Sequence, residues 1–181
     1  MMSDIATSST QPPGEFAVSL SNQQSRHAVD QDQVVAAVRS VLSDSALTSA
    51  AVSVAVVDDA TIHDLNRRYL DHDWPTDVLS FVLEERDGHL EGEVIVGADT
   101  AAVSAAEIGW PAAAELLLYA VHGTLHLIGY GDETTAEKRK MRAAEAAVLR
   151  RFGFEQPASP SGKRPTARAA ASRSTGGMQA K

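Results

Sequence analysis

The sequence predicts an α+β protein in which about five helices pack on a small mixed sheet of four strands. Two observations lead to this class. Segments with the two-residue period of strands alternate with helical segments up to about residue 96, whereas every periodic segment after it is helical. Strands that gather early in a chain and helices that gather late are typical of the α+β class.

Four segments predict the strands of this sheet. Residues 16–20 alternate apolar with small or polar side chains, as a half-buried strand does. Residues 50–57 form a nearly continuous apolar run rich in valine, which is typical of a strand covered on both faces. Residues 78–83 and 90–96 flank the turn signal Asp87-Gly88, so we expect these two strands to pair as a hairpin.

The helices are marked by the residues at their ends. A side-chain oxygen that accepts from the first-turn N–H groups begins a helix, proline is tolerated at its first position, and glycine often ends it. The five predicted helices run from Asp30 to about residue 42, from Asp58 or Asp59 to about residue 69, over residues 98–108 before Gly109, from Pro111 to Ile128 before Gly129, and from the capping box of Thr134 and Glu137 to Phe152.

The chain is expected to fold over residues 15–155, as a single domain between two tails. Residues 1–14 are small and polar and end in Pro-Pro-Gly, and residues 156–181 are rich in Ala, Ser, Pro, Gly and basic side chains. Neither segment can bury enough apolar surface to offset the entropy of ordering, so we predict that both tails are disordered.

Composition excludes several classes of protein. The chain has no cysteine, which excludes a disulfide scaffold, a cysteine-ligated metal site and a thiol nucleophile. No apolar run approaches the ~18–20 residues that span a bilayer, and no basic segment followed by an apolar core begins the chain. We therefore predict a cytoplasmic protein that does not contact membranes.

The charge is unevenly distributed. The net charge is −8, but residues 156–181 hold five basic residues and no acidic one. Residues 1–155 hold 11 basic and 24 acidic residues, a net charge of −13. Since neutralisation of phosphates supplies most non-specific nucleic-acid affinity, an RNA partner requires a local basic surface, and DNA is not expected as a partner.

The segment HGTLHLIGYGD, from His122 to Asp132, has the spacing of a metal site. Residues four apart on a helix lie on one face, so His122 and His126 can hold one ion between them. Gly129 permits a sharp turn, after which the Asp132 carboxylate can return to the same ion. Three protein ligands with an open fourth position are typical of a catalytic zinc site, although a histidine pair on an amphipathic helix is also often incidental.

The missing carboxylate beside His122 limits the chemistry. The spacing of HxxxH, glycine and a third ligand is that of the metzincin proteases, which place a glutamate general base directly after the first histidine. Here that position is Gly123, so peptide hydrolysis by that route is disfavoured. A metal-bound water as nucleophile, acting on a phosphodiester, does not require this glutamate.

Two further segments supply candidate residues. Glu115 lies seven residues before His122, and it either hydrogen-bonds a ligand imidazole or is a solvated glutamate near the helix N-terminus. Asn66, Arg68 and Asp77 belong to a helix–loop–strand segment and are candidates for substrate binding, while Asp77 can equally cap backbone N–H groups of the loop.

At these two segments the sequence resembles the YbeY family of endoribonucleases, also called rRNA maturation factors. The family signature is close to H-G-x-L-H-L-x-G-Y-D-H, and HGTLHLIGYGD matches it at nine of eleven places. The upstream pattern L-N-x-x-Y-R…T-D-V-L-S-F matches Leu65, Asn66, Tyr69 and residues 76–81. The resemblance covers roughly residues 16–152.

Two positions depart from the family pattern. Asp132 stands where the family has its third histidine ligand, and Gly131 precedes it where the family has aspartate. A carboxylate is an accepted zinc ligand, but it adds negative charge and should make a bound water less acidic. Leu70 stands where the family carries an arginine thought to act on the substrate.

The resemblance implies an endoribonuclease with one Zn²⁺ per chain that cleaves single-stranded RNA. It implies a role in maturation of the 16S rRNA 3′ end, with the small ribosomal subunit as partner, and in ribosome quality control. Residues 133–152 contain six basic and three acidic side chains directly after the third ligand. Lys138 and Arg142 are therefore candidates for binding RNA phosphates, although the same charges also suit an ordinary solvated helix face.

Two other functions remain open from the sequence. A metalloprotease would need a general base from elsewhere in the fold, such as Glu115 or Glu133. A non-enzymatic ribosome-assembly factor would use the metal only to fix the end of the helix.

Overall fold

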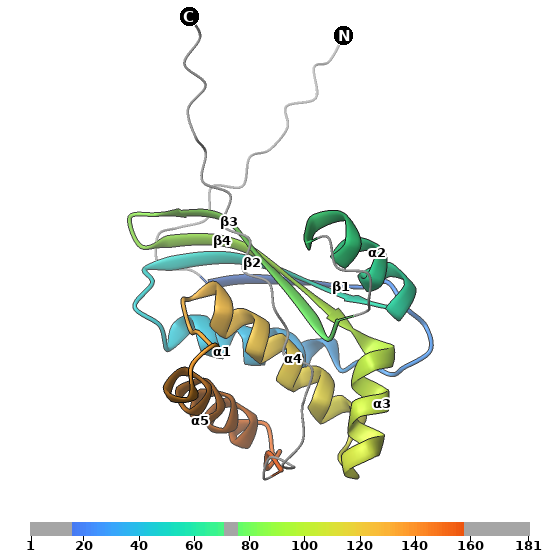
Figure 1. Ribbon diagram of the computed structural model, residues 1–181. Coiled ribbons are helices and arrows are strands. Elements are labelled where there is room, and N and C mark those ends of the chain that lie inside the picture. Colours follow the sequence, from blue (N-terminus) through green and yellow to red (C-terminus); the bar gives the residue numbers. More distant parts are fainter. Residues whose placement is uncertain (1–15, 71–75, 158–181) are drawn as a thin grey trace, which may run out of the picture.

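A computed structural model describes residues 16–70 and 76–157 of the chain. Over these residues it has four strands and five helices, so the α+β class and each predicted element are confirmed (Figure 1). The strands are β1 (Phe16–Asn22), β2 (Ser49–Val57), β3 (Val78–Arg86) and β4 (His89–Gly97). The helices are α1 (Gln31–Ser43), α2 (Asp59–Leu70), α3 (Ala98–Ile108), α4 (Ala112–Leu127) and α5 (Thr135–Arg151). Residues 1–14 and 158–181 of the two predicted tails lie outside the described residues.

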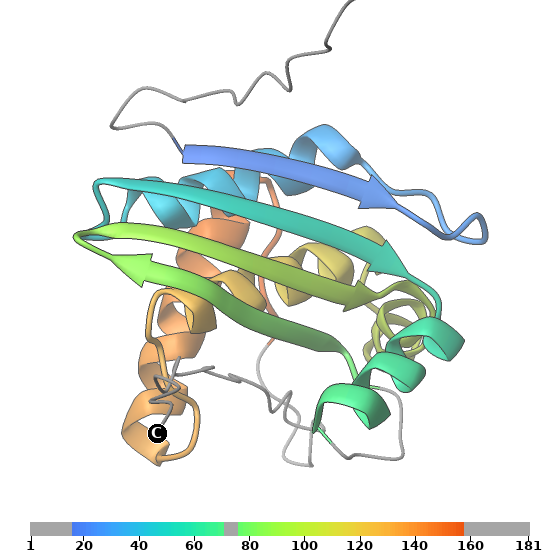
Figure 2. The same cartoon turned by 90° about the horizontal axis from the view of Figure 1, so that it is seen from above.

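The sheet is mixed, with the strand order β1-β2-β4-β3. The strands β1, β2 and β4 run parallel, and β3 pairs antiparallel with β4 in the predicted hairpin (Figure 2). Asp87 and Gly88 turn this hairpin with positive φ angles of 52° and 79°, a conformation that aspartate tolerates better than most residues and that glycine adopts freely.

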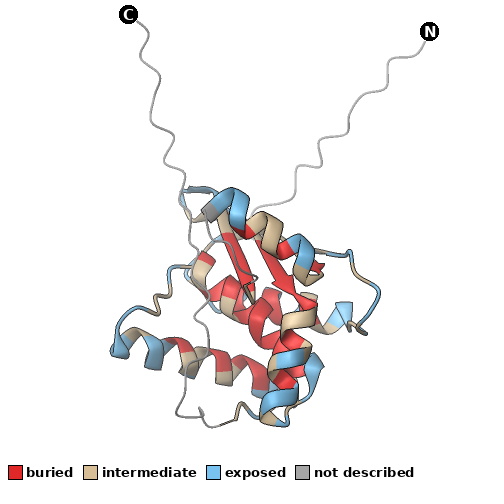
Figure 3. Ribbon diagram, turned by 45° about the vertical axis from the view of Figure 1, so that its right-hand side comes forward, coloured by how far each residue is buried: buried red, intermediate tan, exposed pale blue. Residues whose placement is uncertain are grey.

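One face of the sheet is covered by helices and forms the main core. In β2 the side chains that point to this face are Ala50, Val52, Val54 and Val56, all at most 2% exposed. Helices α1 and α4 pack on them, and α5 packs against α4 from the other side (Figure 1). Helix α4 is therefore enclosed by the sheet, α1, α3 and α5, and Figure 3 shows it as a buried element.

The opposite face is covered only in part, by α2. Ile62 of α2 is fully buried against Val57, Leu79 and Ile95, which point away from the main core. This small cluster fixes α2 at the end of the sheet where β2 and β4 finish (Figure 1). None of the helices in residues 16–70 and 76–157 is long and apolar enough to cross a lipid bilayer.

The N-termini of α2 and α3 cap each other. Asp99 Oδ2 accepts from the Asp59 backbone N–H at 3.1 Å, and Asp59 Oδ1 accepts from the N–H and hydroxyl of Thr100 at 3.0 and 2.8 Å. Asp99 Oδ1 also lies 2.8 Å from His27 Nε2. These hydrogen bonds link two helices that both start at the end of the sheet where β2 and β4 finish.

Substitution of Asp99 by alanine should lower the free energy of unfolding by about 0.5–2 kcal/mol near neutral pH, as loss of a cap does. The hydrogen bond from the Asp59 N–H, followed by that from His27, lowers the pKa of Asp99. A lowered carboxyl pKa stabilises the fold above the unfolded-state value and loses this effect as the pH falls through the folded-state value. Urea unfolding at pH 7 and below pH ~4 should therefore show the difference shrinking in acid, with Asp32→Ala as the control.

Candidate metal centre

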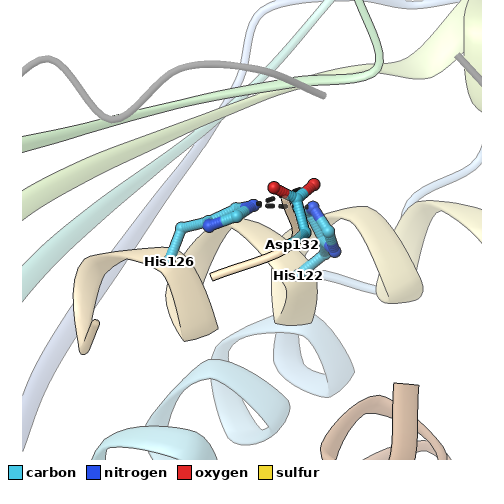
Figure 4. Close-up of side chains that lie close together, drawn as sticks. All are labelled: His122, His126 and Asp132. Carbon is cyan, nitrogen blue, oxygen red and sulfur yellow. Dashed lines mark hydrogen bonds and ion pairs between the residues drawn. The ribbon is translucent and has the colours of Figure 1, made fainter. Parts of the chain in front are cut away.

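The two histidines lie near the end of α4, where the chain turns back. His122 and His126 are one helical turn apart, and their side chains point toward each other in Figure 4. The helix ends at Leu127 with Ile128 as its C-cap, and Gly129 takes a φ of +90° that side-chain-bearing residues rarely adopt. The Tyr130 N–H then donates to the Leu125 carbonyl at 3.0 Å, which closes the turn. This turn directs Asp132 back to the histidines, as its spacing predicts.

The three predicted ligand atoms converge. His122 Nε2 and His126 Nε2 are 2.9 Å apart, and Asp132 Oδ2 is 3.9 Å from His126 Nε2 (Figure 4). All three ligand atoms lie within 4.8 Å of one another. Two nitrogens bound to zinc at 2.0–2.1 Å stand about 2.8–3.4 Å apart for angles between 90° and the tetrahedral value. The group is therefore the right size for a small divalent cation.

The outer nitrogens of both rings are already engaged. His122 Nδ1 donates to Glu145 Oε1 at 2.7 Å, and His126 Nδ1 donates to the Tyr130 carbonyl at 2.9 Å. Since both partners are acceptors, each neutral ring carries its proton on Nδ1 and presents a lone pair from Nε2. Two lone pairs repel at 2.9 Å unless a cation, a proton or a metal ion, lies between them. The donor set therefore fits a bound metal.

The electrostatics of the site also favour positive charge. Burial disfavours the charged form of His122, but the Glu145 hydrogen bond and the charges of Glu145, Asp77 and Asp132 outweigh it and raise the pKa of His122. Burial and the neighbouring His122 lower the pKa of His126, so the pair does not bind two protons readily. One cation shared by both rings is the arrangement that these surroundings stabilise.

The carboxylate on His122 belongs to Glu145, not to Glu115. Glu115 is 2% exposed, in the first turn of α4, where it interacts with Tyr119. The prediction for Glu115 used its helical phase, but seven residues rise about 10.5 Å along a helix, and the outer nitrogen of His122 is taken by Glu145 instead. The alternative of a solvated glutamate is also wrong, because Glu115 is buried.

Glu145 was missed by sequence reasoning, although a signal was present. Met141, Glu145, Val148 and Leu149 form the buried stripe of α5. A carboxylate within an apolar stripe requires a hydrogen-bonded partner, because an unpaired buried charge is costly. Applied to α5, that rule indicates Glu145 as a residue that reaches across to α4.

Of the other predicted site residues, Asp77 lies close enough to His122 for their charges to interact. Its Oδ1 accepts from Thr76 Oγ1 and the Val78 N–H, both at 3.0 Å, so the predicted loop cap is present. Burial raises the pKa of Asp77, while the nearby His122 opposes that shift. Asp77 therefore caps the loop and contributes negative charge to the site.

Two predicted residues lie on α2, across the sheet from α4. Asn66 is buried at 1% exposure, and Arg68 is exposed and pairs with Asp64 at 2.6 Å. The side chain of Leu70, and residues 71–75 with Asp71 and His72, lie outside the described residues.

Basic side chains flank the site along α5. The capping box of Thr134 and Glu137 starts this helix two residues after Asp132. Lys138, Arg139 and Lys140 are exposed, and the Lys140 ammonium lies 4.8 Å above the Tyr130 ring. Arg142 is partly buried and donates to the Pro157 carbonyl. Lys140 thus places a positive charge beside the turn that carries Asp132, while Lys138 and Arg139 are exposed on the same first part of α5.

Gly123 occupies the position of the protease general base and faces the sheet. A Cβ atom there would lie 2.7 Å from side-chain carbons of both Val78 and Val94 and 2.8 Å from Ser80 Oγ. Ser80 Oγ also donates to the Gly123 carbonyl at 3.0 Å. No side chain fits at this position, so a glutamate cannot replace Gly123 without moving α4 from the sheet.

The fold and the site together define an α+β protein with a candidate centre of two histidines and a carboxylate at the end of a buried helix. The family model described as endoribonuclease YbeY matches residues 19–153. The chain belongs to the YbeY endoribonuclease family, whose members are hydrolases that act on RNA.

Individual relatives agree. Endoribonuclease YbeY of Rhodopirellula baltica is 42% identical over 131 residues, which cover 67% of this chain and 68% of that protein. The proteins of the same name from Syntrophotalea carbinolica and Moorella thermoacetica are 36% and 38% identical over 97% and 98% of their lengths, and 76% of this chain. A solution structure of a Thermotoga maritima protein has the same fold, with a TM-score of 0.53, 23% identity and coverage of 82% of this chain and 99% of that one.

Proposed function

We propose that this protein hydrolyses single-stranded RNA at one Zn²⁺ held by His122, His126 and Asp132. We further propose that it acts in the cytoplasm on rRNA of the small subunit, in maturation of the 16S rRNA 3′ end and in ribosome quality control. The observation that carries this proposal is the pair of Nε2 atoms 2.9 Å apart, both with acceptor-bound Nδ1 atoms, beside the Asp132 carboxylate.

The protein supplies position and charge. Zn²⁺ bound there supplies a Lewis acid that polarises a phosphoryl oxygen and promotes ionisation of water near neutral pH. Glu145 and the Tyr130 carbonyl fix the rotation of the two rings, so that both Nε2 atoms face the same point. Asp77 lies close enough to His122 to favour the site's positive charge. No carboxylate follows His122, which supports a phosphodiester rather than a peptide substrate.

RNA binding is assigned to the basic side chains at the start of α5. Lys138, Arg139 and Lys140 are exposed at the start of α5, and Lys140 lies over Tyr130 in the turn before Asp132, so we propose that they bind phosphates of the RNA. Arg142 is a weaker candidate, because its guanidinium already donates to Pro157. Asn66 and Arg68 lie on α2, on the face of the sheet opposite α4. We therefore propose that they bind substrate only if the RNA is long enough to pass around the sheet from one face to the other.

The proposal is tested with purified protein and end-labelled RNA oligonucleotides that carry the 16S 3′ precursor sequence or a scrambled one. Chelation should abolish cleavage of the single strand, zinc should restore it, and a duplex of the same sequence should stay intact. Chelation that lowers thermal stability, without cleavage of any RNA at any zinc concentration, would instead indicate an assembly factor. Casein turnover that requires the metal would indicate a protease.

The unusual third ligand leads to a separate prediction. Replacing Asp132 by histidine exchanges a carboxylate for a neutral imidazole and removes one negative charge from the ligand set. The variant should retain zinc. The acid limb of its pH–cleavage profile should move down by roughly one pH unit, because a less negative ligand set favours ionisation of a water on the bound zinc. The control is Glu133→Gln, which removes the exposed negative charge of the residue that follows Asp132. A profile identical to that of the wild type would contradict the role given to Asp132.

A further inference from the structure

The chain continues past α5 and returns to the candidate metal centre. Gly153 takes a φ of +82°, and the Phe154 N–H donates to the Leu149 carbonyl at 3.1 Å, which turns the chain back along α5. Phe154 packs against the core, and the Pro157 carbonyl accepts from Arg142. These contacts hold residues 154–157 alongside the helix that carries Glu145.

The returning segment places an amide on Glu145. Gln156 Nε2 donates to Glu145 Oε2 at 2.9 Å, while Glu145 Oε1 accepts from His122 Nδ1 at 2.7 Å. One carboxylate thus joins the amide to the ligand imidazole, through a different oxygen for each. The amide orientation follows from the chemistry, because a carboxylate accepts and only the NH₂ end of glutamine donates.

The other end of the same amide makes no bond. Gln156 Oε1 is buried and has no hydrogen-bond partner among the described residues. A buried acceptor without a partner opposes folding, and such groups are uncommon in native proteins. The side chain is therefore better explained by its single bond to Glu145 than by its contribution to stability.

We propose that Gln156 is a positioning residue of the metal centre, which acts through Glu145 on His122. Its N–H holds the Glu145 carboxylate in the rotation that keeps Oε1 on His122 Nδ1, and hence keeps His122 Nε2 directed at a first-row divalent metal. This inference rests on the proposed function. Gln156 lies beyond residues 19–153 that the family model matches, so this support is supplied by a segment outside the family's matched region.

The test uses the full chain and Co²⁺, whose visible absorption reports the geometry of its ligands, with Zn²⁺ affinity measured by competition with a chromogenic chelator. Gln156→Met keeps a similar length and removes the donor, and Gln156→Glu places a second carboxylate against Glu145. Both should weaken Zn²⁺ and Co²⁺ binding, by no more than the ~10-fold lower end of the loss that removing a ligand's own hydrogen-bond partner causes, and should change the Co²⁺ absorption band. Melting of the metal-free Gln156→Met protein should stay close to the wild-type value, whereas Gln156→Glu should also melt lower, because it adds a like charge against a buried carboxylate. Gln31→Met, on the exposed start of α1, should change nothing.

Repeating the Gln156 substitution in a Glu145→Ala protein tests whether Gln156 acts on the metal through Glu145 or only stabilises the fold. In Glu145→Ala, adding Gln156→Met should cause no further loss of affinity, because the path from Gln156 to the metal is already broken. Independent losses in the two variants, or wild-type affinity and absorption in Gln156→Met, would overturn the role of Gln156 alone. A wild-type protein that binds neither ion would overturn the proposed function together with it.

Discussion

The His126→Ala variant is expected to lose both its metal and its RNA cleavage while remaining folded. His126 supplies one of three ligand atoms, so metal affinity should fall by more than the roughly 100-fold that loss of an outer hydrogen bond costs. The free energy of unfolding of the metal-free variant should lie at most ~1–2 kcal/mol below that of the metal-free wild type. The loss is small because the substitution also removes the repulsion between two lone pairs 2.9 Å apart. Metal content by atomic emission and cleavage of labelled single-stranded RNA measure the two effects.

The matched control is His89→Ala. His89 is a partly exposed histidine of β4 that contacts Ser49 and Glu91, and it takes no part in the ligand group. This variant should keep wild-type metal content and activity. Zinc retained together with unchanged cleavage in His126→Ala would reject the proposed centre.

The Gly123→Ala variant is expected to be the most destabilising single-methyl addition in α4. The added carbon would lie within 2.8 Å of three atoms of β3 and β4, and both valines involved are at most 2% exposed. Overpacking of this kind costs about 1–3 kcal/mol, which urea unfolding resolves. Since Gly123 is next to His122, the shift of α4 should also weaken metal binding.

A double-variant cycle identifies the cause. Val94→Ala alone leaves a cavity and is destabilising, but it removes one of the atoms that the new methyl meets. The two substitutions together should therefore cost less than the sum of the single ones, by about 0.5–3 kcal/mol. Strict additivity would show that the space around Gly123 is larger than these distances indicate.

Local patterns predicted the elements well, because caps, turns and periods are properties of short segments. Asp30, Gly109 and the capping box at Thr134 mark helix ends in the structure as they do in the sequence. The strand order is a different matter. β4 lies between β2 and β3. This order depends on how all the strands pack together against α4, so it cannot be read from any single segment.

The same division applies to the site. His122, His126 and Asp132 converge because a helical turn and a glycine turn are both local, and the spacing predicted them. The supporting groups are not local. Glu145 lies 23 residues from His122, and Gln156 reaches it from beyond the last helix. Glu115 was chosen because helical phase is readable from a sequence, whereas the partner that His122 takes lies on another helix.

The enclosure of α4 has a consequence for which ions can be used. With the sheet on one side and α5 on the other, the two imidazoles cannot separate widely, so the protein sets the size of the coordination sphere. Calcium, with bonds of about 2.3–2.6 Å, prefers six to eight oxygen donors, which two imidazoles and one carboxylate do not provide. Zinc, cobalt and nickel differ little in radius, so competition among them should follow intrinsic affinity and cellular supply instead of fit.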